Sequence, residues 1–239
     1  NGVGMYIHSD ILFTLGEKTA SMAKTLGGKV KKILPVGSLF MERDFFNRNL
    51  KNDFFSYDIL VFASNHNSNF HSGYNSYYED YYLHFDWIKK FSEENPNFKI
   101  GIKFKTILTD QKVKEKFSKS NNVKFLVDKS LDWSDSYFFA DKAKSLCTWS
   151  STLGFEFIGF GRECYFIDPG RRNIGFLPNE EYLNKAKVKD YDEFKSKMLK
   201  LINGETNHEI IKNQKSFCFK SNSVSELILK YFKEFENKL

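Results

Sequence analysis

Short apolar runs alternate with helical patterns along most of the chain. In residues 79–94, for example, Trp87, Ile88 and Phe91 recur at helical spacing on one side. Strands are predicted at 11–15, 30–36, 58–63, 99–105, 123–127, 145–149 and 164–167, and helices at 17–26, 79–94, 110–119, 135–143, 151–160, 180–186, 191–202 and 224–235. Because parallel neighbours need a crossover, which is usually helical, this alternation predicts an α/β fold with a Rossmann-type parallel sheet and helices on both faces.

The pattern is interrupted between residues 40 and 56, where polar and aromatic residues mix without a clean period. This stretch predicts a domain boundary. Residues 1–53 are expected to be the end of one α/β domain with its hinge, and residues 54–239 a second domain with C-terminal helices. The last helix, 224–235, is expected to pack back across the hinge. The chain opens on Asn1 within a structured segment, which favours a fragment of a longer protein.

Composition narrows the classes of protein. The 239 residues are 41% hydrophobic, enough for a packed core, and no apolar run approaches the roughly 20 residues of a membrane span. Cys147, Cys164 and Cys218 are far apart and odd in number, so neither a zinc site nor a disulfide framework is predicted, and a cytoplasmic protein is expected. The net charge of +6 suits an anionic ligand or membrane face, but the basic residues are dispersed, which argues against a nucleic-acid partner.

One turn carries the strongest chemical signal. The predicted strand 145–149 ends in the hydroxyl residues Ser150, Ser151 and Thr152, and a helix begins at once. Ser150 or Ser151 can cap that helix, and the free amides of its first turn, at the positive end of the helix dipole, would bind a phosphate. The alternative is an ordinary capped helix, since Ser and Thr are common caps.

Two residues within this helix extend the prediction. Gly154 would let the backbone or a ligand approach closely, and Glu156, about one turn in, could accept hydrogen bonds from ribose or sugar hydroxyls. Glu156 could instead complete a capping box at the start of the helix. The residues alone are consistent with both interpretations.

Residues 140–169 resemble the donor-site signature of GT-B glycosyltransferases, in which paired hydroxyl residues, a small residue and a Glu precede a Gly and a strand. The likeness is strongest to the branch that makes bacterial surface carbohydrates. That branch includes capsule and lipopolysaccharide transferases, among them enzymes for Kdo and sialic acid, and the glycerophosphate polymerases of teichoic acid. Residues 11–38 look like the last strand, helix and strand of the family's N-terminal domain. The resemblance implies an acceptor-side domain ending at residue 53, most of it missing here, and a nucleotide-sugar-binding domain at 54–239.

Many of these transferases carry a His-Pro pair at the end of the strand that matches residues 100–105, where the His contacts the nucleotide phosphate. This chain has Lys103 and Lys105 in that region instead. Either lysine could supply positive charge for the donor phosphate, although the missing pair weakens an assignment to cytidine donors. In the alternative interpretation, both lysines face solvent on either side of an inward Phe104.

Three further residues are expected at the same edge of the sheet. His66 lies in a polar loop where the donor or acceptor of a GT-B enzyme would pass, although a loop histidine is more often a solvated bystander. Asp168 and Arg171 follow another strand, and an arginine there could bind phosphate or a sugar carboxylate. A surface turn with incidental charges is an equal alternative. No residue stands out as a catalytic base.

Together these features predict a glycosyltransferase that moves a sugar from a CMP- or UDP-linked donor to a surface-polysaccharide or lipid-linked acceptor. No cofactor is expected, and no Asp-x-Asp cluster at a strand end points to a metal. The expected location is the cytoplasm, with peripheral contact at the inner membrane face left open. Two alternatives stand beside this function: a nucleotide-sugar 2-epimerase of the same architecture, and a non-catalytic nucleotide- or glycan-binding domain.

Overall fold

The computed structural model describes residues 8–17, 19–21, 29–42, 56–63, 75–104, 110–127, 134–149, 151–170, 185–212, 218 and 223–236. The chain divides into two compact units. The first comprises Asn1–Leu50, Phe155–Arg162 and Glu209–Leu239, and the second comprises Lys51–Gly154 and Glu163–His208. Two segments that the sequence assigned to the second domain, 155–162 and 209–239, therefore belong to the first unit.

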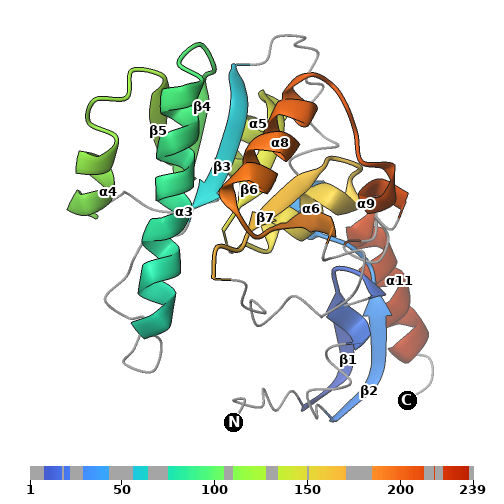
Figure 1. Ribbon diagram of the computed structural model, residues 1–239. Helices are drawn as coiled ribbons and strands as arrows, with labels where there is room; N and C mark the ends of the chain where they lie inside the picture. Colours follow the sequence, from blue (N-terminus) through green and yellow to red (C-terminus); the bar gives the residue numbers. More distant parts are fainter. Residues whose placement is uncertain are drawn as a thin grey trace. The chain divides into compact units, whose positions relative to one another are not determined.

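The second unit is built on a six-stranded parallel sheet (Figure 1). In spatial order its strands are β5 (Val123–Val127), β4 (Ile100–Phe104), β3 (Tyr57–Ala63), β6 (Ala143–Thr148), β7 (Cys164–Ile167) and β8 (Lys187–Val188). Every neighbouring pair is parallel. The chain builds outward from β3 through β4 to β5 and then returns to the other side of β3 with β6. This is the strand order of dinucleotide-binding folds, and the predicted Rossmann-type sheet is confirmed.

The central strands are continuous apolar runs because both faces of the sheet are covered. Ile59, Leu60 and Val61 of β3 are completely buried. In the register of the sheet, Val61 lies between Ile102 of β4 and Cys147 of β6, which are also completely buried. Removing an aliphatic side chain of this size from water contributes roughly 1.5–3 kcal/mol. The centre of the sheet is therefore the main core of the second unit.

Helices cover both faces of this sheet. They are α3 (Asn75–Glu94), α4 (Gln111–Lys116), α5 (Ser134–Asp141) and α8 (Tyr191–Ile202). Helices α3 and α8 pack together on one face, and α5 lies on the other (Figure 1). The ring of Phe194 on α8 lies 6.3 Å from that of Trp87 and 5.8 Å from that of Phe91, both on α3. Also on α3, Phe85 lies 6.1 Å from Phe104 of β4, so α3 packs on the sheet through aromatic side chains.

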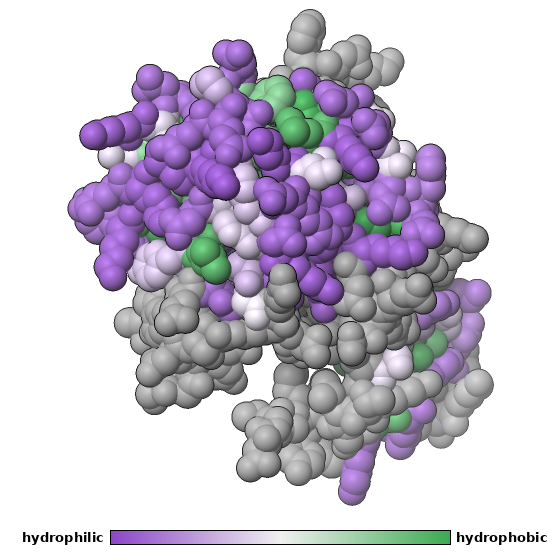
Figure 2. All heavy atoms as spheres, in the orientation of Figure 1, coloured by the Kyte–Doolittle hydropathy of each residue, from purple (hydrophilic) through white to green (hydrophobic). Residues whose placement is uncertain are grey.

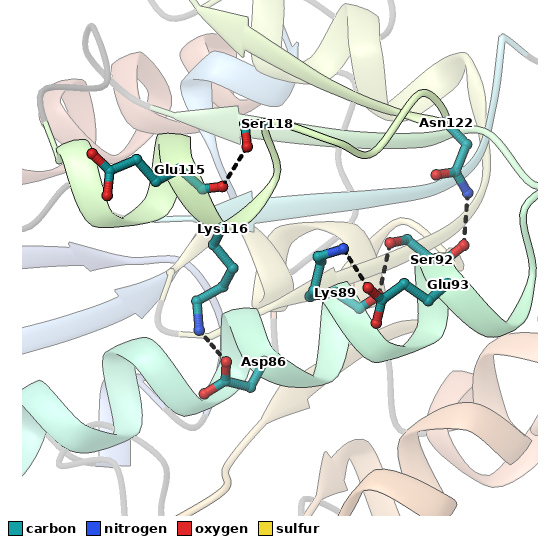
Figure 3. A network of polar contacts seen from close by, with 8 residues as sticks. All are labelled: Asp86, Lys89, Ser92, Glu93, Glu115, Lys116, Ser118 and Asn122. Carbon is teal, nitrogen blue, oxygen red and sulfur yellow. Dashed lines mark hydrogen bonds and ion pairs between the residues drawn. The ribbon is translucent and has the colours of Figure 1, made fainter.

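Polar contacts orient α3 against its neighbours (Figure 3). Lys116 of α4 forms an ion pair with Asp86 of α3, and the side-chain amide of Asn122 donates to the carbonyl of Ser92 at 3.1 Å. Exposed pairs of this kind contribute about 0–1 kcal/mol, so they set the position of α3 more than they stabilise the unit. On the face drawn in Figure 2, the described residues of this unit present mostly hydrophilic side chains with small apolar patches.

The first unit contains the parallel strands β1 (His8–Thr14) and β2 (Lys29–Pro35), the short helix α2 (Leu39–Met41), most of α9 (His208–Lys212) and the helix α11 (Val224–Glu236). The ring of Phe232 on α11 lies 5.6 Å from that of Phe13 on β1. The hydroxyl of Ser225 donates to the carboxylate of Glu42 at 2.6 Å. These contacts confirm that the last helix packs back on the N-terminal segment. None of the described helices is both long and apolar enough to cross a bilayer.

Replacing Phe104 by Ala is expected to lower the free energy of unfolding by about 3–5 kcal/mol, because the change leaves a cavity among completely buried side chains. Urea unfolding followed by circular dichroism measures the loss. The control is Leu83→Ala on the outer side of α3, where the side chain is 38% exposed and the expected change is within about 1 kcal/mol. Equal losses in the two variants would contradict this account of the core.

Candidate functional site

The strand order creates one topological switch point in the second unit, between β3 and β6. From these adjacent strands the chain departs in opposite directions, and in open α/β sheets ligands bind outside the carboxyl ends at such a point. β3 ends at Ala63 and β6 ends at Thr148. The buried hydroxyl of Thr148 donates to the carbonyl of Phe62 at 2.9 Å, so a side-chain hydrogen bond joins the two strand ends.

The turn predicted to bind phosphate lies directly after β6, at this switch point. The hydroxyl of Ser151 accepts from the amide of Leu153 at 3.3 Å, and its carbonyl accepts from the amide of Gly154 at 3.2 Å. Ser151 thereby closes the turn at the start of α6 (Leu153–Gly159), as a cap residue would. Thr152 is exposed beside it. Ser150 lies outside the described residues.

Gly154 is in close contact with the protein itself. An ideal Cβ built on it would lie 2.6 Å from Cζ of Phe166 on β7 and 3.1 Å from the methyl group of Thr148 on β6. No side chain fits there without a shift of the phenyl ring. The close approach that the sequence predicted is therefore that of Gly154 itself to Phe166 and Thr148, and the glycine is explained by this packing.

Glu156 is buried in the first unit, where its carboxylate accepts from the hydroxyl of Ser38 at 2.7 Å. The same hydroxyl accepts from the amide of Met41 and caps α2. Burial raises the pKa of the Cys218 thiol to about 12, and the nearby charge of Glu156 contributes to that shift. The sequence predicted that Glu156 accepts a hydrogen bond from a ribose or sugar hydroxyl. In the structure it accepts one from a hydroxyl of the protein itself.

Lys103 lies at the carboxyl end of β4, and only 2% of it is exposed. Its ammonium group donates to the carbonyl of Phe104 at 2.7 Å. The alternative that placed this lysine in solvent is therefore wrong. The amino group is instead held inside the unit, beside the switch point, because β4 pairs directly with β3. Lys105 lies outside the described residues.

Asp168 follows β7, and its side chain is also buried. Its amide donates to the carbonyl of Val188 at 2.8 Å, which extends the pairing with β8. Burial lowers the pKa of Lys187 on β8, and the carboxylate of Asp168 opposes that shift by stabilising the charged ammonium group. A solvated surface turn therefore does not describe Asp168. His66 and Arg171 lie outside the described residues.

The sequence did not single out the contact between His84 and Trp149. His84 of α3 is completely buried, and its ring is nearly parallel to the indole of Trp149, with an interplanar angle of 6° and a centroid distance of 5.4 Å. Burial lowers the pKa of His84 to about 3 and outweighs backbone hydrogen bonds with Asp80 and Tyr81, which raise it, so the imidazole is neutral near neutral pH. His84 precedes Ile88 by four residues and so lies on the same side of the predicted helix, but nothing in the spacing indicates a partner 65 residues later.

Two other features bear on the choice of site. The described residues contain no group of three or more His, Cys, Asp or Glu side chains that could hold a metal ion. A pocket of about 520 Å³ in the first unit is lined by Ser9, Asp10, Lys29, Val30 and Lys31. None of the residues predicted from the sequence lines it, so the switch point remains the better candidate.

No protein-family model matches the sequence, and no curated protein matches it. Among solved structures, the chain is similar to S. aureus MnaA in a structure with UDP, with a TM-score of 0.59 and 15% identity over 97% of this chain and 61% of that one. It is also similar to the UDP-GlcNAc 2-epimerase of Neisseria meningitidis bound to UDP-GlcNAc, with a TM-score of 0.56 and 14% identity over 95% of this chain and 62% of that one. A third similar structure is the UDP-GlcNAc 2-epimerase of Methanocaldococcus jannaschii with UDP-GlcNAc and UDP, at a TM-score of 0.55 and 14% identity, over 95% of this chain and 61% of that one.

The chain spans 61–62% of the length of these three proteins. At such low identity the likeness shows the fold, which is of the GT-B-like α/β type. It does not distinguish a transferase from an epimerase.

Replacing Gly154 by Ala is expected to lower the free energy of unfolding by about 1–3 kcal/mol, because the added methyl group overlaps the ring of Phe166. A double-mutant cycle with Phe166→Leu tests the cause, since the smaller side chain leaves room for the methyl group. The cost of Gly154→Ala should be smaller in the Phe166→Leu background. Strictly additive costs would show that the strain arises elsewhere.

The low pKa of His84 predicts a pH dependence of stability. Between about 3 and the ordinary value of 6.5, the unfolded chain takes up a proton on this residue while the folded protein does not, so acid lowers stability through that window. His84→Phe removes the effect. The wild type should lose about 2 kcal/mol more than the variant between about pH 7 and pH 5, measured by urea unfolding at both. A pH-independent difference would show that His84 titrates normally.

Proposed function

We propose that this chain is the nucleotide-binding part of an enzyme that acts on a nucleotide sugar, with the nucleotide phosphates bound at the switch point between β3 and β6. The observation that carries the proposal is the turn after β6, which emerges at the carboxyl edge where the strand order reverses. The similarity to structures described with UDP or UDP-GlcNAc supports a uridine nucleotide over a cytidine one.

The proposed phosphate contacts come from the turn and from nearby cations. The hydroxyls of Ser150, Ser151 and Thr152 would donate to phosphate oxygens, and the buried charge of Lys103 would favour the anion from within the unit. Lys105 is a second candidate cation. Positive charge held in a partly desolvated site stabilises a departing nucleoside diphosphate more than a solvated lysine could.

The remaining predicted residues have proposed roles in holding the nucleoside and sugar. Gly154 would act through its packing on Phe166, which positions the start of the helix after the turn. For Glu156, whose carboxylate binds the Ser38 hydroxyl, a contact with ribose hydroxyls stays a prediction. His66, Asp168 and Arg171 would face the sugar from the neighbouring strand ends. The residues that bind the acceptor, the catalytic base and any contact with a membrane would lie outside the described residues. Independence from metal stays a prediction.

The favoured reaction is glycosyl transfer, because the donor-site signature of residues 140–169 resembles that of transferases. Epimerisation at C2 of a UDP-sugar is the second candidate, and the two UDP-GlcNAc 2-epimerases with the same fold favour it. The two reactions differ in what they require. A transferase moves the sugar to an acceptor hydroxyl and releases the nucleotide, so it needs an acceptor. An epimerase converts the sugar nucleotide without any second substrate.

Nucleotide binding is tested by titrating the protein with UDP, CDP and CMP and following its melting temperature. UDP at about 100 times its Kd should stabilise the protein by about 2.7 kcal/mol, with a smaller effect of CMP and none of phosphate at equal concentration. Thr152→Ala should weaken UDP binding and leave the melting temperature of the free protein unchanged, because Thr152 is exposed. Equal stabilisation by free phosphate and UDP would defeat the proposal.

The two reactions are separated by incubating the protein with UDP-GlcNAc and no acceptor in deuterated water. An epimerase would form the C2 epimer and exchange the hydrogen at C2 with solvent, which proton NMR detects. A transferase would leave the sugar nucleotide intact until a glycan or lipid-linked acceptor is added. Conversion without acceptor would overturn the transferase assignment in favour of the epimerase.

A further inference from the structure

One face of α3 contacts two of the turns that follow strands at the carboxyl edge. His84 stacks on Trp149, which follows β6. One helical turn earlier on α3, the carboxylate of Asp80 lies against Gly170, which follows β7, so closely that a Cβ on this glycine would overlap it. Tyr81, between them on α3, lies edge-on to the same indole at 5.6 Å. The helix therefore holds the indole of Trp149 from two directions.

Trp149 is the residue through which the chain leaves β6 and enters the turn. Only 6% of it is exposed, so the indole is a fixed group inside the unit and not a surface platform for a ligand. Its backbone leads within two residues to Ser151, whose hydroxyl and carbonyl shape the start of α6. The indole therefore anchors the chain two residues before Ser151.

An imidazole is a costly side chain for this position. Backbone hydrogen bonds with Asp80 and Tyr81 offset only part of the cost of burying its ring nitrogens, because the pKa of the imidazole is still lowered to about 3, and an apolar side chain would avoid that cost. The ring of His84 also lies 3.9 Å, between centroids, from that of Phe85. The flat imidazole presents a planar surface nearly parallel to the indole of Trp149. This planar contact gives a reason for a ring at position 84.

We propose that His84 is a positioning residue for the nucleotide site: by stacking on Trp149 it holds Ser151 and Thr152 in the arrangement that binds the nucleotide phosphates. This inference rests on the proposed function. In this proposal α3 does not touch the nucleotide, but its residue His84 contributes to the affinity for it.

The test compares His84→Leu, which keeps an apolar side chain but removes the flat ring, with His84→Phe, which restores a ring. Isothermal titration with UDP should show a Kd about tenfold higher for His84→Leu, equivalent to about 1.4 kcal/mol, and a Kd within about twofold of wild type for His84→Phe. The matched control is Phe91→Leu, a completely buried ring two turns along α3 that packs on Phe194 and not on Trp149. It should lower stability with the UDP Kd unchanged.

A spectroscopic measurement reports the turn directly. With Trp87 and Trp133 replaced by Phe, the fluorescence of Trp149 should shift on UDP binding, and His84→Leu should shift the emission of the free protein while His84→Phe does not. An unchanged UDP Kd in His84→Leu, or the same loss in Phe91→Leu, would overturn the inference while leaving the proposed function standing. A wild-type protein that binds no UDP would overturn both.

Discussion

The pairing of β3 on both of its edges is the constraint from which the rest of the second unit follows. β3 is the first strand of the unit in the chain, yet it lies at the centre of the sheet between β4 and β6. The chain must therefore leave β3 toward one side and leave β6 toward the other. The connections after these two strands diverge at the carboxyl edge, while the hydrogen bond from the Thr148 hydroxyl joins the strand ends themselves. The position of the candidate site is a result of topology and would exist whatever residues filled the turn.

Most of this sheet was predictable because strands buried on both faces are continuous apolar runs, which require no knowledge of their partners. Strand β8 was the exception. It has two residues, Lys187 and Val188, and follows a segment whose spacing predicted a helix. The particular partners of α11 were also beyond a local pattern, because they lie about 200 positions earlier in the chain, as the ring of Phe13 does.

The chemistry of the site was only partly predictable, because a sequence gives the side chains but not how deeply each is buried. Charged residues are seldom fully buried without a partner, so Lys103 was weighed as a solvent-facing lysine. In the structure the partner of Lys103 is the carbonyl of Phe104, the next residue in the chain. The partner of Glu156 is far away in the sequence: the hydroxyl of Ser38 lies 118 residues earlier. Neither contact leaves a trace in spacing or composition.

Charged residues are buried near both edges of the sheet, so burial alone does not mark the site. Glu163, directly before β7, is 6% exposed, and its carboxylate accepts from the hydroxyl of Tyr165 at 2.9 Å and from the amide of Asn207 at 2.7 Å. Near the carboxyl ends, Lys103, Asp168 and Lys187 are all at most 4% exposed. Burying a charged group costs free energy that its partners only partly return, so contacts within the unit must hold each of these side chains. What distinguishes the carboxyl edge is the reversal of strand order between β3 and β6, and the case for a site there rests on that topology.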